Sequence, residues 1–145
     1  MEKVIFFPLN ISEPILFYGN NYTCSKYVFD GLARKEDRFT WTDGNQLVLK
    51  AKLENYATGT PVHAFLDCNV FNGTQRVNAV INNSERIELV AHDGSPLEFD
   101  FMPPEDGLLT IELEFPDAIS PKALGRSGDS RNLALAMKSI VFTQD

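Results

Sequence analysis

Residues that could contact a sugar surround Trp41, the only tryptophan in this 145-residue chain. An aromatic face can stack on the C–H face of a sugar ring, while carboxylate, amide and guanidinium groups nearby hydrogen-bond to its hydroxyls. This chemistry predicts a ligand-binding set of Trp41, Phe39, Glu36, Arg38, Asp43 and Asn82. The alternative is structural: Trp41 fills one end of the core, and Asp43 only shapes the turn that follows it.

A second polar pair, Asp129 and Arg131, lies in the loop that follows a predicted strand ending at Phe115. As a structural clamp, Asp129 would accept backbone N–H groups and Arg131 would pair with a carboxylate such as Glu36 or Asp117. A bidentate pair of this kind can fix a long loop. As a binding group, Arg131 would instead meet an anionic sugar or a phosphate. The pattern favours the clamp and leaves anion binding open.

The histidines do not indicate catalysis. The chain has two of them, His63 and His92, and no nucleophile-elbow motif, whereas a catalytic triad needs a nucleophile and a carboxylate within reach of its histidine. His63 and Asp67 are four residues apart on a predicted strand, so about 13 Å separates them, which is too far for one metal ion. An enzyme is therefore the least expected class of function.

Neighbouring carboxylates give no stronger signal for catalysis. Glu112 with Glu114, and Glu98 with Asp100, share strand faces at a separation that could serve glycoside hydrolysis. Any two residues that alternate on a strand meet this distance, so the spacing has little specificity. Solvated strand faces explain both pairs.

Metal ligands and disulfides are not indicated either. Cys24 and Cys68 fit neither a zinc pattern nor a disulfide scaffold, and two buried thiols are expected rather than a bridge. Calcium prefers carboxylate, amide and backbone oxygens, and Asn20, Asn21 and Asp129 would be the candidate ligands. No ligand spacing supports such a site, so neither a metal nor a cofactor is predicted.

The composition is that of one soluble globular domain spanning residues 1–145. The net charge is −7, and the 13 lysines and arginines form no basic stripe, so nucleic acid binding is not expected. No apolar run approaches the roughly 20 residues of a membrane span. The opening of the chain lacks a signal-peptide cleavage pattern, which predicts a cytoplasmic product or a fragment of a larger chain.

Short segments in which apolar and polar residues alternate follow one another along the whole chain. The clearest is 46–53, whose leucines and alanine all fall on one face, as in a half-buried strand. Turn-forming pairs such as Asp43-Gly44 and Asn72-Gly73 separate such segments. The expected strands are 3–9, 15–18, 27–29, 39–41, 46–53, 62–70, 76–81, 86–90, 97–102, 107–115 and 133–142, with one helical turn at 120–124.

Many short strands at a spacing of about ten residues indicate an all-β antiparallel sandwich, and a jelly roll of the galactose-binding-like type is the favoured version. The segment 133–142 is apolar on both faces, which predicts a central position in a packed sheet. The β-branched residues Ile140 and Val141 favour a strand over a helix there.

Several stretches in a fixed order carry a family resemblance: Tyr27 to Gly31; Glu36 with 39–44; 75–77 with Val80 and Asn82; and 115–140, which contains FPDA, DSR, LALA and KSI. Together they make residues 19–142 similar to the small β-sandwich module found beside or within bacterial glycosyltransferases and phosphoglycerol-transferase-type proteins of surface-glycan assembly. The resemblance implies an association with polysaccharide synthesis and a glycosyltransferase as partner. It implies no catalytic residue.

The leading hypothesis is a non-catalytic carbohydrate-associated module that binds a bacterial surface polysaccharide or its precursor. The alternative is a structural or protein-interaction module without a ligand, an oligomerising one included. Exposed apolar residues on both faces of 133–142 would favour that alternative. The sugar, the oligomeric state and the exposure of Trp41 are left open by the sequence.

Overall fold

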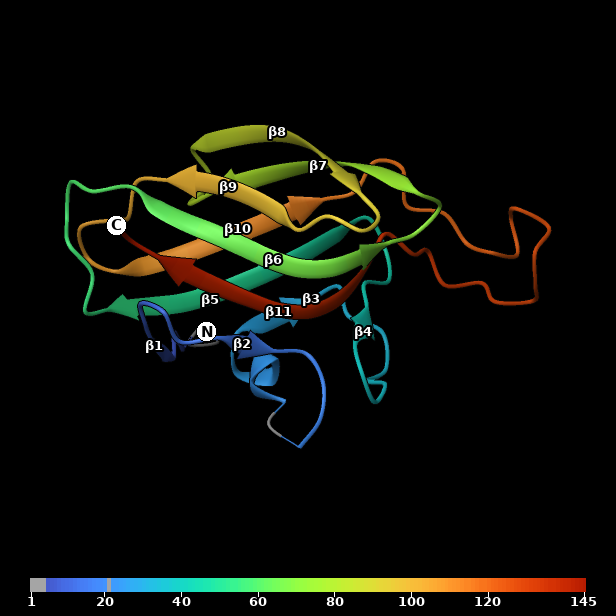
Figure 1. The fold of residues 1–145 in the computed structure, drawn as a ribbon, viewed down its shortest axis with the longest axis horizontal. Coiled ribbons are helices and arrows are strands. Elements are labelled where there is room, and N and C mark those ends of the chain that lie inside the picture. The colour runs from blue at the N-terminus through green and yellow to red at the C-terminus, as the bar shows by residue number, and fades with distance from the viewer. Residues whose placement is uncertain (1–4, 21) are drawn as a thin grey trace, which may run out of the picture.

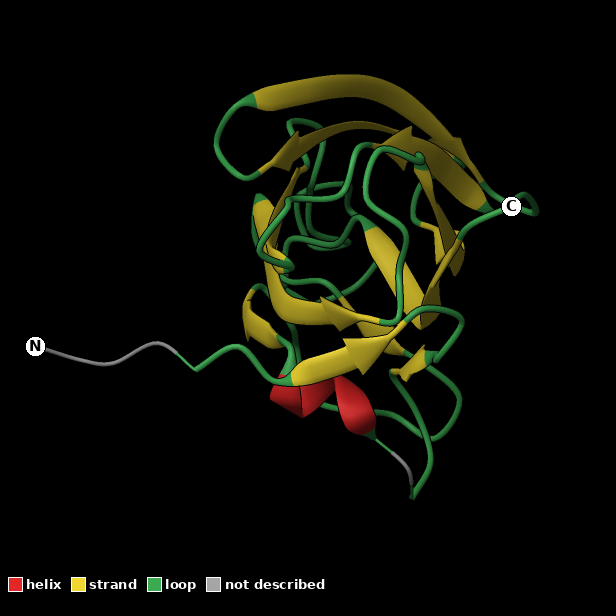
Figure 2. Cartoon of the chain, turned by 90° about the vertical axis from the view of Figure 1, so that its left-hand side faces the viewer, coloured by secondary structure: helices red, strands yellow, loops and turns green. Residues whose placement is uncertain are grey.

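The computed structural model describes residues 5–20 and 22–145 and shows a sandwich of two β-sheets (Figures 1 and 2). Within these residues the one helix is the short 3-10 helix η1, and no helix is long and apolar enough to cross a membrane. The elements are β1 (Pro8–Asn10), β2 (Ile15–Leu16), η1 (Thr23–Lys26), β3 (Val28–Asp30), β4 (Thr40–Trp41), β5 (Gln46–Glu54), β6 (Val62–Val70), β7 (Thr74–Ile81), β8 (Glu85–His92), β9 (Leu97–Phe101), β10 (Leu108–Glu114) and β11 (Leu135–Thr143).

The larger sheet has the strand order β1-β5-β10-β7-β8, and β3 also pairs with β5. The smaller sheet has the order β2-β11-β6-β9, and β4 also pairs with β11. Each of these pairings is antiparallel except that of β1 with β5. The predicted fold class, an all-β antiparallel jelly-roll sandwich, is confirmed.

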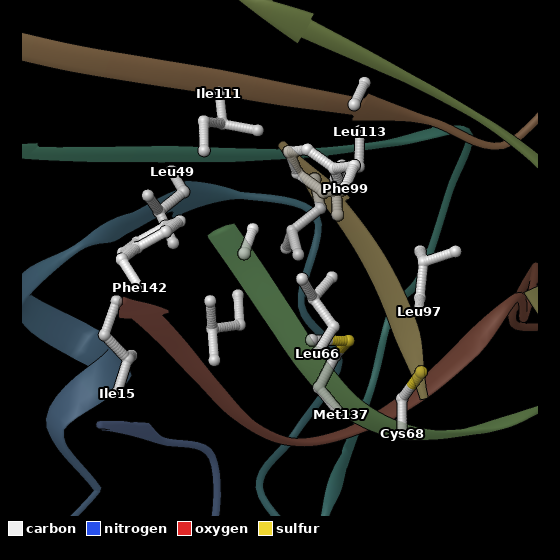
Figure 3. Close-up of a cluster of buried hydrophobic side chains, with 14 of the residues drawn as sticks. Ile15, Leu49, Leu66, Cys68, Leu97, Phe99, Ile111, Leu113, Met137 and Phe142 are labelled. Carbon is white, nitrogen blue, oxygen red and sulfur yellow. The ribbon is translucent and has the colours of Figure 1, made fainter. Parts of the chain in front are cut away.

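One hydrophobic core fills the space between the sheets (Figure 3). The alternating residues of β5 point into it, and Leu49 lies opposite Ile111 of β10 in the same layer. Leu66 and Phe142 meet them from the smaller sheet. Burying one such side chain contributes about 1.5–3 kcal/mol relative to leaving it exposed, so period-two alternation fixes which face of each strand turns inward.

Strand β11 lies inside the smaller sheet, as its apolar composition predicts, with β6 on one side and β2 and β4 on the other. Its register against β6 shifts between Met137 and Ser139, so a bulge interrupts the alternation there. Ala136 and Met137 are both buried although they are sequence neighbours. No residue of β11 has an exposed apolar side chain.

The short elements at the edges differ most from the expectation. The expected strand at 3–9 is observed as β1, Pro8–Asn10, and Lys3 lies outside the described residues. The helix η1 was not predicted. The segment 120–124 forms the single turn expected there, in which the Leu124 N–H donates to the carbonyl of Ser120 at 3.2 Å. Ser120 caps that turn, because its Oγ accepts the backbone N–H of Ala123 at 3.0 Å. Short edge elements carry too little hydrophobic pattern to fix their limits.

Cys24 and Cys68 are free and buried, which confirms the prediction of two thiols rather than a bridge. Cys68 lies among the core residues of β6, and burial raises the pKa of its thiol to about 11. A thiol that stays protonated at neutral pH is a poor nucleophile. Both cysteines therefore act as small core residues.

Gly31 permits a close approach that no other residue would allow. Its φ is +105°, and a Cβ there would lie 2.1 Å from the carbonyl oxygen of Gln46. We expect Gly31→Ala to lower the free energy of unfolding by about 1–2 kcal/mol for the left-handed backbone and by a further 1–3 kcal/mol for the clash. Urea unfolding measures the loss.

Gly44 is the matched control, because its φ is +112° and a Cβ there meets nothing within 4 Å. Gly44→Ala should therefore show the backbone cost alone. Equal losses in the two variants would contradict a steric role for Gly31.

Candidate functional site

Three aromatic side chains meet at one end of the sandwich. The ring centroids of Phe39 and Trp41 are 5.8 Å apart, and those of Trp41 and Phe71 are 5.9 Å apart, both in edge-to-face arrangements. All three side chains are half-buried. Trp41 is thus neither an ordinary core residue nor a freely exposed one, and its indole lies at the rim between the core and solvent. We call Phe39, Trp41 and Phe71 the aromatic cluster.

The pairing of β4 with β11 holds Trp41 in place, with Trp41 opposite Ala136. Its neighbours Thr40 and Thr42 are fully buried. The Thr40 hydroxyl donates to the carbonyl of Phe17 at 2.7 Å, and Thr42 Oγ1 accepts the backbone N–H of Leu135 at 3.1 Å. Because side chains alternate along a strand, the two inward threonines direct Trp41 outward.

Phe71 is fixed by the turn between β6 and β7. Its N–H donates to the carbonyl of Ala134 at 2.8 Å, and its own carbonyl accepts the Gln75 side-chain amide at 3.1 Å. Asn72 and Gly73 follow with φ of +62° and +86°, so the predicted Asn-Gly turn is confirmed. The aromatic cluster is therefore built from two segments that are far apart in the sequence, 39–41 and the turn that begins at Phe71.

Arg126 is a further contact of Phe71. Its guanidinium carbon is 5.9 Å from the centre of the Phe71 ring, and its Nη2 donates to Oδ1 of Asn72 at 2.9 Å. Neither Phe71 nor Arg126 was predicted as a site residue. Phe71 carries a signal in the sequence, since an aromatic residue directly before an Asn-Gly turn must lie at the end of a strand. Arg126 carries none, because a tertiary contact places it.

Asp43 connects β4 to the loop between β10 and β11, and both lie at the same end of the molecule (Figure 1). Its Oδ1 accepts the backbone N–H of Asn132 at 3.0 Å, and the N–H of Gly44 donates to the carbonyl of Asn132 at 2.9 Å. Glu36 and Arg38 are exposed in the segment that leads into β4. The structure thus brings Trp41, Phe39 and Asp43 together, with Glu36 and Arg38 nearby in the chain.

The clamp in the loop before β11 differs in its partners from the prediction. Arg131 pairs with Asp129 itself at 2.8 Å, not with Glu36 or Asp117. Asp129 also accepts the backbone N–H of Arg131 at 3.0 Å, and these bonds lower the pKa of its carboxyl group. They likewise raise the pKa of Arg131, and the carboxylates of Glu36 and Asp43 add a smaller effect.

Asp117 is engaged elsewhere. It pairs with Arg76 of β7 at 2.6 Å and accepts the backbone N–H of the same residue at 3.1 Å. Hydrogen bonds from Arg76 lower the pKa of Asp117 to about 2. The loop leaving β10 passes the start of β7 first, so Asp117 meets Arg76 and not Arg131.

Asn82 lies at the opposite end of the sandwich, in the turn between β7 and β8 (Figure 1). Its Oδ1 accepts the N–H of Thr110 at 2.7 Å, and its Nδ2 donates to the carbonyl of Leu108 at 3.2 Å. Asn82 and Asn83 both have positive φ, in a turn that the Ser84 N–H closes by donating to the carbonyl of Ile81 at 3.0 Å. The structure therefore separates Asn82 from the aromatic cluster, and a turn already uses its amide group.

Two polar depressions of about 430 and 390 Å³ lie against the larger sheet and share Asn78 and Pro116. Charged side chains of β7, β8 and β10 line them, among them an ion pair of Arg86 with Glu114 at 2.6 Å. Their single aromatic residue, Phe115, is fully buried. These depressions offer hydrogen bonds but no stacking surface, which distinguishes them from the aromatic cluster.

His63 has an arrangement that the sequence did not predict. On the outer face of the smaller sheet, its Nδ1 is 2.6 Å from Asp100 and its Nε2 is 2.9 Å from Glu98. A ring that donates from both nitrogens is the protonated imidazolium.

No group of three or more His, Cys, Asp or Glu side chains within 5–20 and 22–145 could hold a metal ion. Asn21, a candidate calcium ligand, lies outside the described residues.

A scan against protein-family models gives no match, and no curated protein matches the sequence. Solved structures match the fold. A GH26-CBM35 β-(1,4)-mannanase from Podospora anserina gives a TM-score of 0.55 at 14% identity, over 91% of this chain and 28% of that one. A cycloisomaltooligosaccharide glucanotransferase from a Paenibacillus species, complexed with cycloisomaltoheptaose, gives 0.51 at 13% identity, over 87% and 19%.

The CBM36-1 domain of a multidomain xylanase, from the hindgut metagenome of Trinervitermes trinervoides, gives a TM-score of 0.47 at 16% identity, over 82% of this chain and 91% of that one. At such identities the likeness is one of fold. This chain spans less than a third of the mannanase and of the glucanotransferase, so their catalytic activities are those of much longer proteins.

The carboxylates of Glu98 and Asp100 raise the pKa of His63 above its ordinary value of 6.5. We expect an NMR titration of the folded protein to show this, and Glu98→Gln to lower the pKa. Because the folded pKa exceeds the unfolded one, the contribution to stability is complete below about pH 6.5 and is lost as the pH rises through the folded pKa. It is small, because the pairs are exposed.

Asp67→Asn serves as the control, since Asp67 is exposed on the same strand but accepts no hydrogen bond from His63. This variant should leave the His63 titration nearly unchanged. A wild-type His63 that titrates at or below 6.5 would contradict the two ion pairs.

Proposed function

We propose that this chain is a non-catalytic carbohydrate-binding module whose ligand stacks on Trp41. The observation that carries the proposal is the aromatic cluster: a half-buried indole in edge-to-face contact with Phe39 and Phe71, at one end of the sandwich. A sugar ring gains affinity from such a surface because the indole is already ordered before binding.

The orientation of the rings favours a short or soluble glycan segment over a flat polymer surface. The planes of Phe39 and Phe71 are at 81° and 87° to the plane of Trp41. Three rings at such angles cannot form one continuous platform, as a flat crystalline surface would require. The face of a single ring, that of Trp41, is then the stacking surface, and it has room for one or two sugar rings.

Polar groups next to the cluster can orient the ligand. The Asp43 carboxylate uses Oδ1 for the N–H of Asn132, which leaves Oδ2 available for a sugar hydroxyl. Glu36 and Arg38 are exposed beside Phe39. A few such groups around an apolar surface set orientation and specificity. Binding, not catalysis, is proposed because neither histidine belongs to the aromatic cluster and no nucleophile, base and orienting group are brought together there among the described residues.

The comparisons support a carbohydrate ligand by fold. Two matching structures with TM-scores above 0.5 come from proteins named for carbohydrates, a β-(1,4)-mannanase whose name includes CBM35 and a glucanotransferase bound to cycloisomaltoheptaose. A bacterial surface polysaccharide as ligand, a glycosyltransferase as partner and a cytoplasmic location rest on the sequence alone and stay predictions.

The interaction-module alternative has less support. It would be favoured by exposed apolar residues on both faces of 133–142, and β11 exposes none. Exposed aromatic residues occur instead at the edge of the larger sheet, where Phe29 and Phe7 are 47% and 41% exposed. They lie on β3 and just before β1, not at the aromatic cluster, so they provide a control for the proposed ligand.

The test is a titration of the protein with soluble oligosaccharides, followed by Trp41 fluorescence and by calorimetry. We expect saturable binding with a shift of the emission. Trp41→Ala should weaken binding about 30-fold or more, since buried aromatic anchors contribute at least about 2 kcal/mol. Trp41→Phe should keep part of the affinity. The titration is repeated in EDTA, so that any need for calcium is seen.

Phe29→Ala is the control variant, because it removes an exposed aromatic ring outside the cluster. It should bind as the wild type does. Circular dichroism and thermal melting confirm that each variant is folded. Calorimetry without binding to any oligosaccharide, or binding that survives Trp41→Ala in a folded protein, would refute the proposal.

A further inference from the structure

Arg126 differs from Arg76, Arg86 and Arg131 in the kind of group that its side chain contacts. The chain carries 20 acidic and 13 basic residues, and Arg76, Arg86 and Arg131 each pair with a carboxylate. Among the described residues, no carboxylate forms an ion pair with Arg126. Its partners are neutral: the face of Phe71 and the amide oxygen of Asn72.

These neutral partners hold the guanidinium group without neutralising it. Arg126 is exposed, yet the Phe71 ring and the 2.9 Å hydrogen bond to Asn72 restrict its orientation. Its backbone N–H donates to the carbonyl of Pro121 at 2.9 Å, which fixes the turn that carries it. A guanidinium has five N–H donors, and one is used here. The remaining donors form a fork of the shape that binds an oxyanion at two points.

The acidic groups around this turn are already engaged. Asp129 forms its pair with Arg131, and Asp93 accepts the N–H of Val70 at 2.9 Å. The same turn also holds Lys122, which is exposed. The carboxylates of Asp129 and Asp93 therefore have hydrogen-bond partners of their own, and Lys122 adds a second cation to the turn that carries Arg126.

Phe71 contacts both Trp41 and Arg126. We propose that Arg126 binds an oxyanion carried by the glycan, either the carboxylate of a uronic acid or a phosphate substituent, while a neighbouring sugar ring stacks on Trp41. This inference rests on the proposed function and narrows it to acidic glycans. The fork makes a bidentate contact with the oxyanion, and Asn72 and Phe71 position the fork before the ligand arrives.

A purely structural role for Arg126 gives a different expectation. If Arg126 only tied the turn to Asn72, its removal would lower stability and affect acidic and neutral ligands equally. The inference predicts a loss for the acidic ligand alone. The test therefore compares two ligands that differ in charge and in little else.

The experiment measures calorimetric affinity for trigalacturonic acid and for its fully methyl-esterified form. In the wild type we expect the acid to bind about tenfold more tightly than the ester, as one charge-assisted hydrogen-bonded pair provides. Arg126→Gln should abolish that difference and leave the affinity for the ester unchanged. Arg126→Lys should restore part of it, since it keeps the charge and loses the fork.

Arg86→Gln is the matched control, because Arg86 is an exposed arginine on the larger sheet, paired with Glu114. It removes the same charge and should leave the preference for the acid intact. A parallel titration with glucose 6-phosphate against glucose separates the two oxyanions: an Arg126-dependent preference for the phosphate alone would assign a phosphorylated glycan.

Equal affinities of the acid and the ester in the wild type, together with no preference for the phosphate, would overturn the inference while leaving the proposed function standing. A preference that survives Arg126→Gln in a folded protein would also overturn it. If no oligosaccharide binds at all, the proposed function fails and the inference fails with it.

Discussion

The contact between β4 and β11 is the constraint on which the candidate site depends. β4 has two residues and is held by the buried threonines on either side of Trp41, whose hydroxyls bond to backbone groups of Phe17 and Leu135. A shift of one residue would turn Trp41 inward and both threonines outward. Each backbone group left buried without a partner would cost about 1–3 kcal/mol. The outward position of Trp41 is therefore enforced by the core.

The same contact explains why four separate segments meet at one end of the molecule. Gly31 brings the segment before β4 against the backbone of Gln46 in the larger sheet. The carbonyl of Gly31 accepts the N–H of Asp43 at 2.8 Å. Asp43 in turn holds Asn132 in the loop that leads into β11. The site thus spans the junction of the two sheets, where strand ends leave backbone groups for loops to satisfy.

Period-two patterning allowed the long strands to be predicted, and β6 matches its predicted limits because Val62 to Val70 alternates throughout. The site was harder to predict, since its members come together through tertiary contacts. Trp41 and Asp43 are close because only two positions separate them in the chain, which the sequence shows. Arg126 reaches Phe71 only because two distant turns lie at one end of the sandwich. Asn82 could not be excluded from the sequence alone, because an asparagine that closes a turn and one that binds a sugar look the same.

The charge of the whole chain and the charge of the site act on an acidic ligand in opposite directions. A net charge of −7 repels a polyanion at long range, and salt screens this repulsion beyond a Debye length of roughly 8–10 Å. A bidentate contact at a guanidinium acts at hydrogen-bond distance, where screening by salt is weaker. Moderate salt therefore weakens the long-range repulsion between the protein and an acidic ligand more than it weakens the bidentate contact at the guanidinium. A cation pre-positioned by neutral groups is what a strongly acidic protein needs to select an acidic glycan, because a cation already paired with a carboxylate would offer the ligand no net attraction.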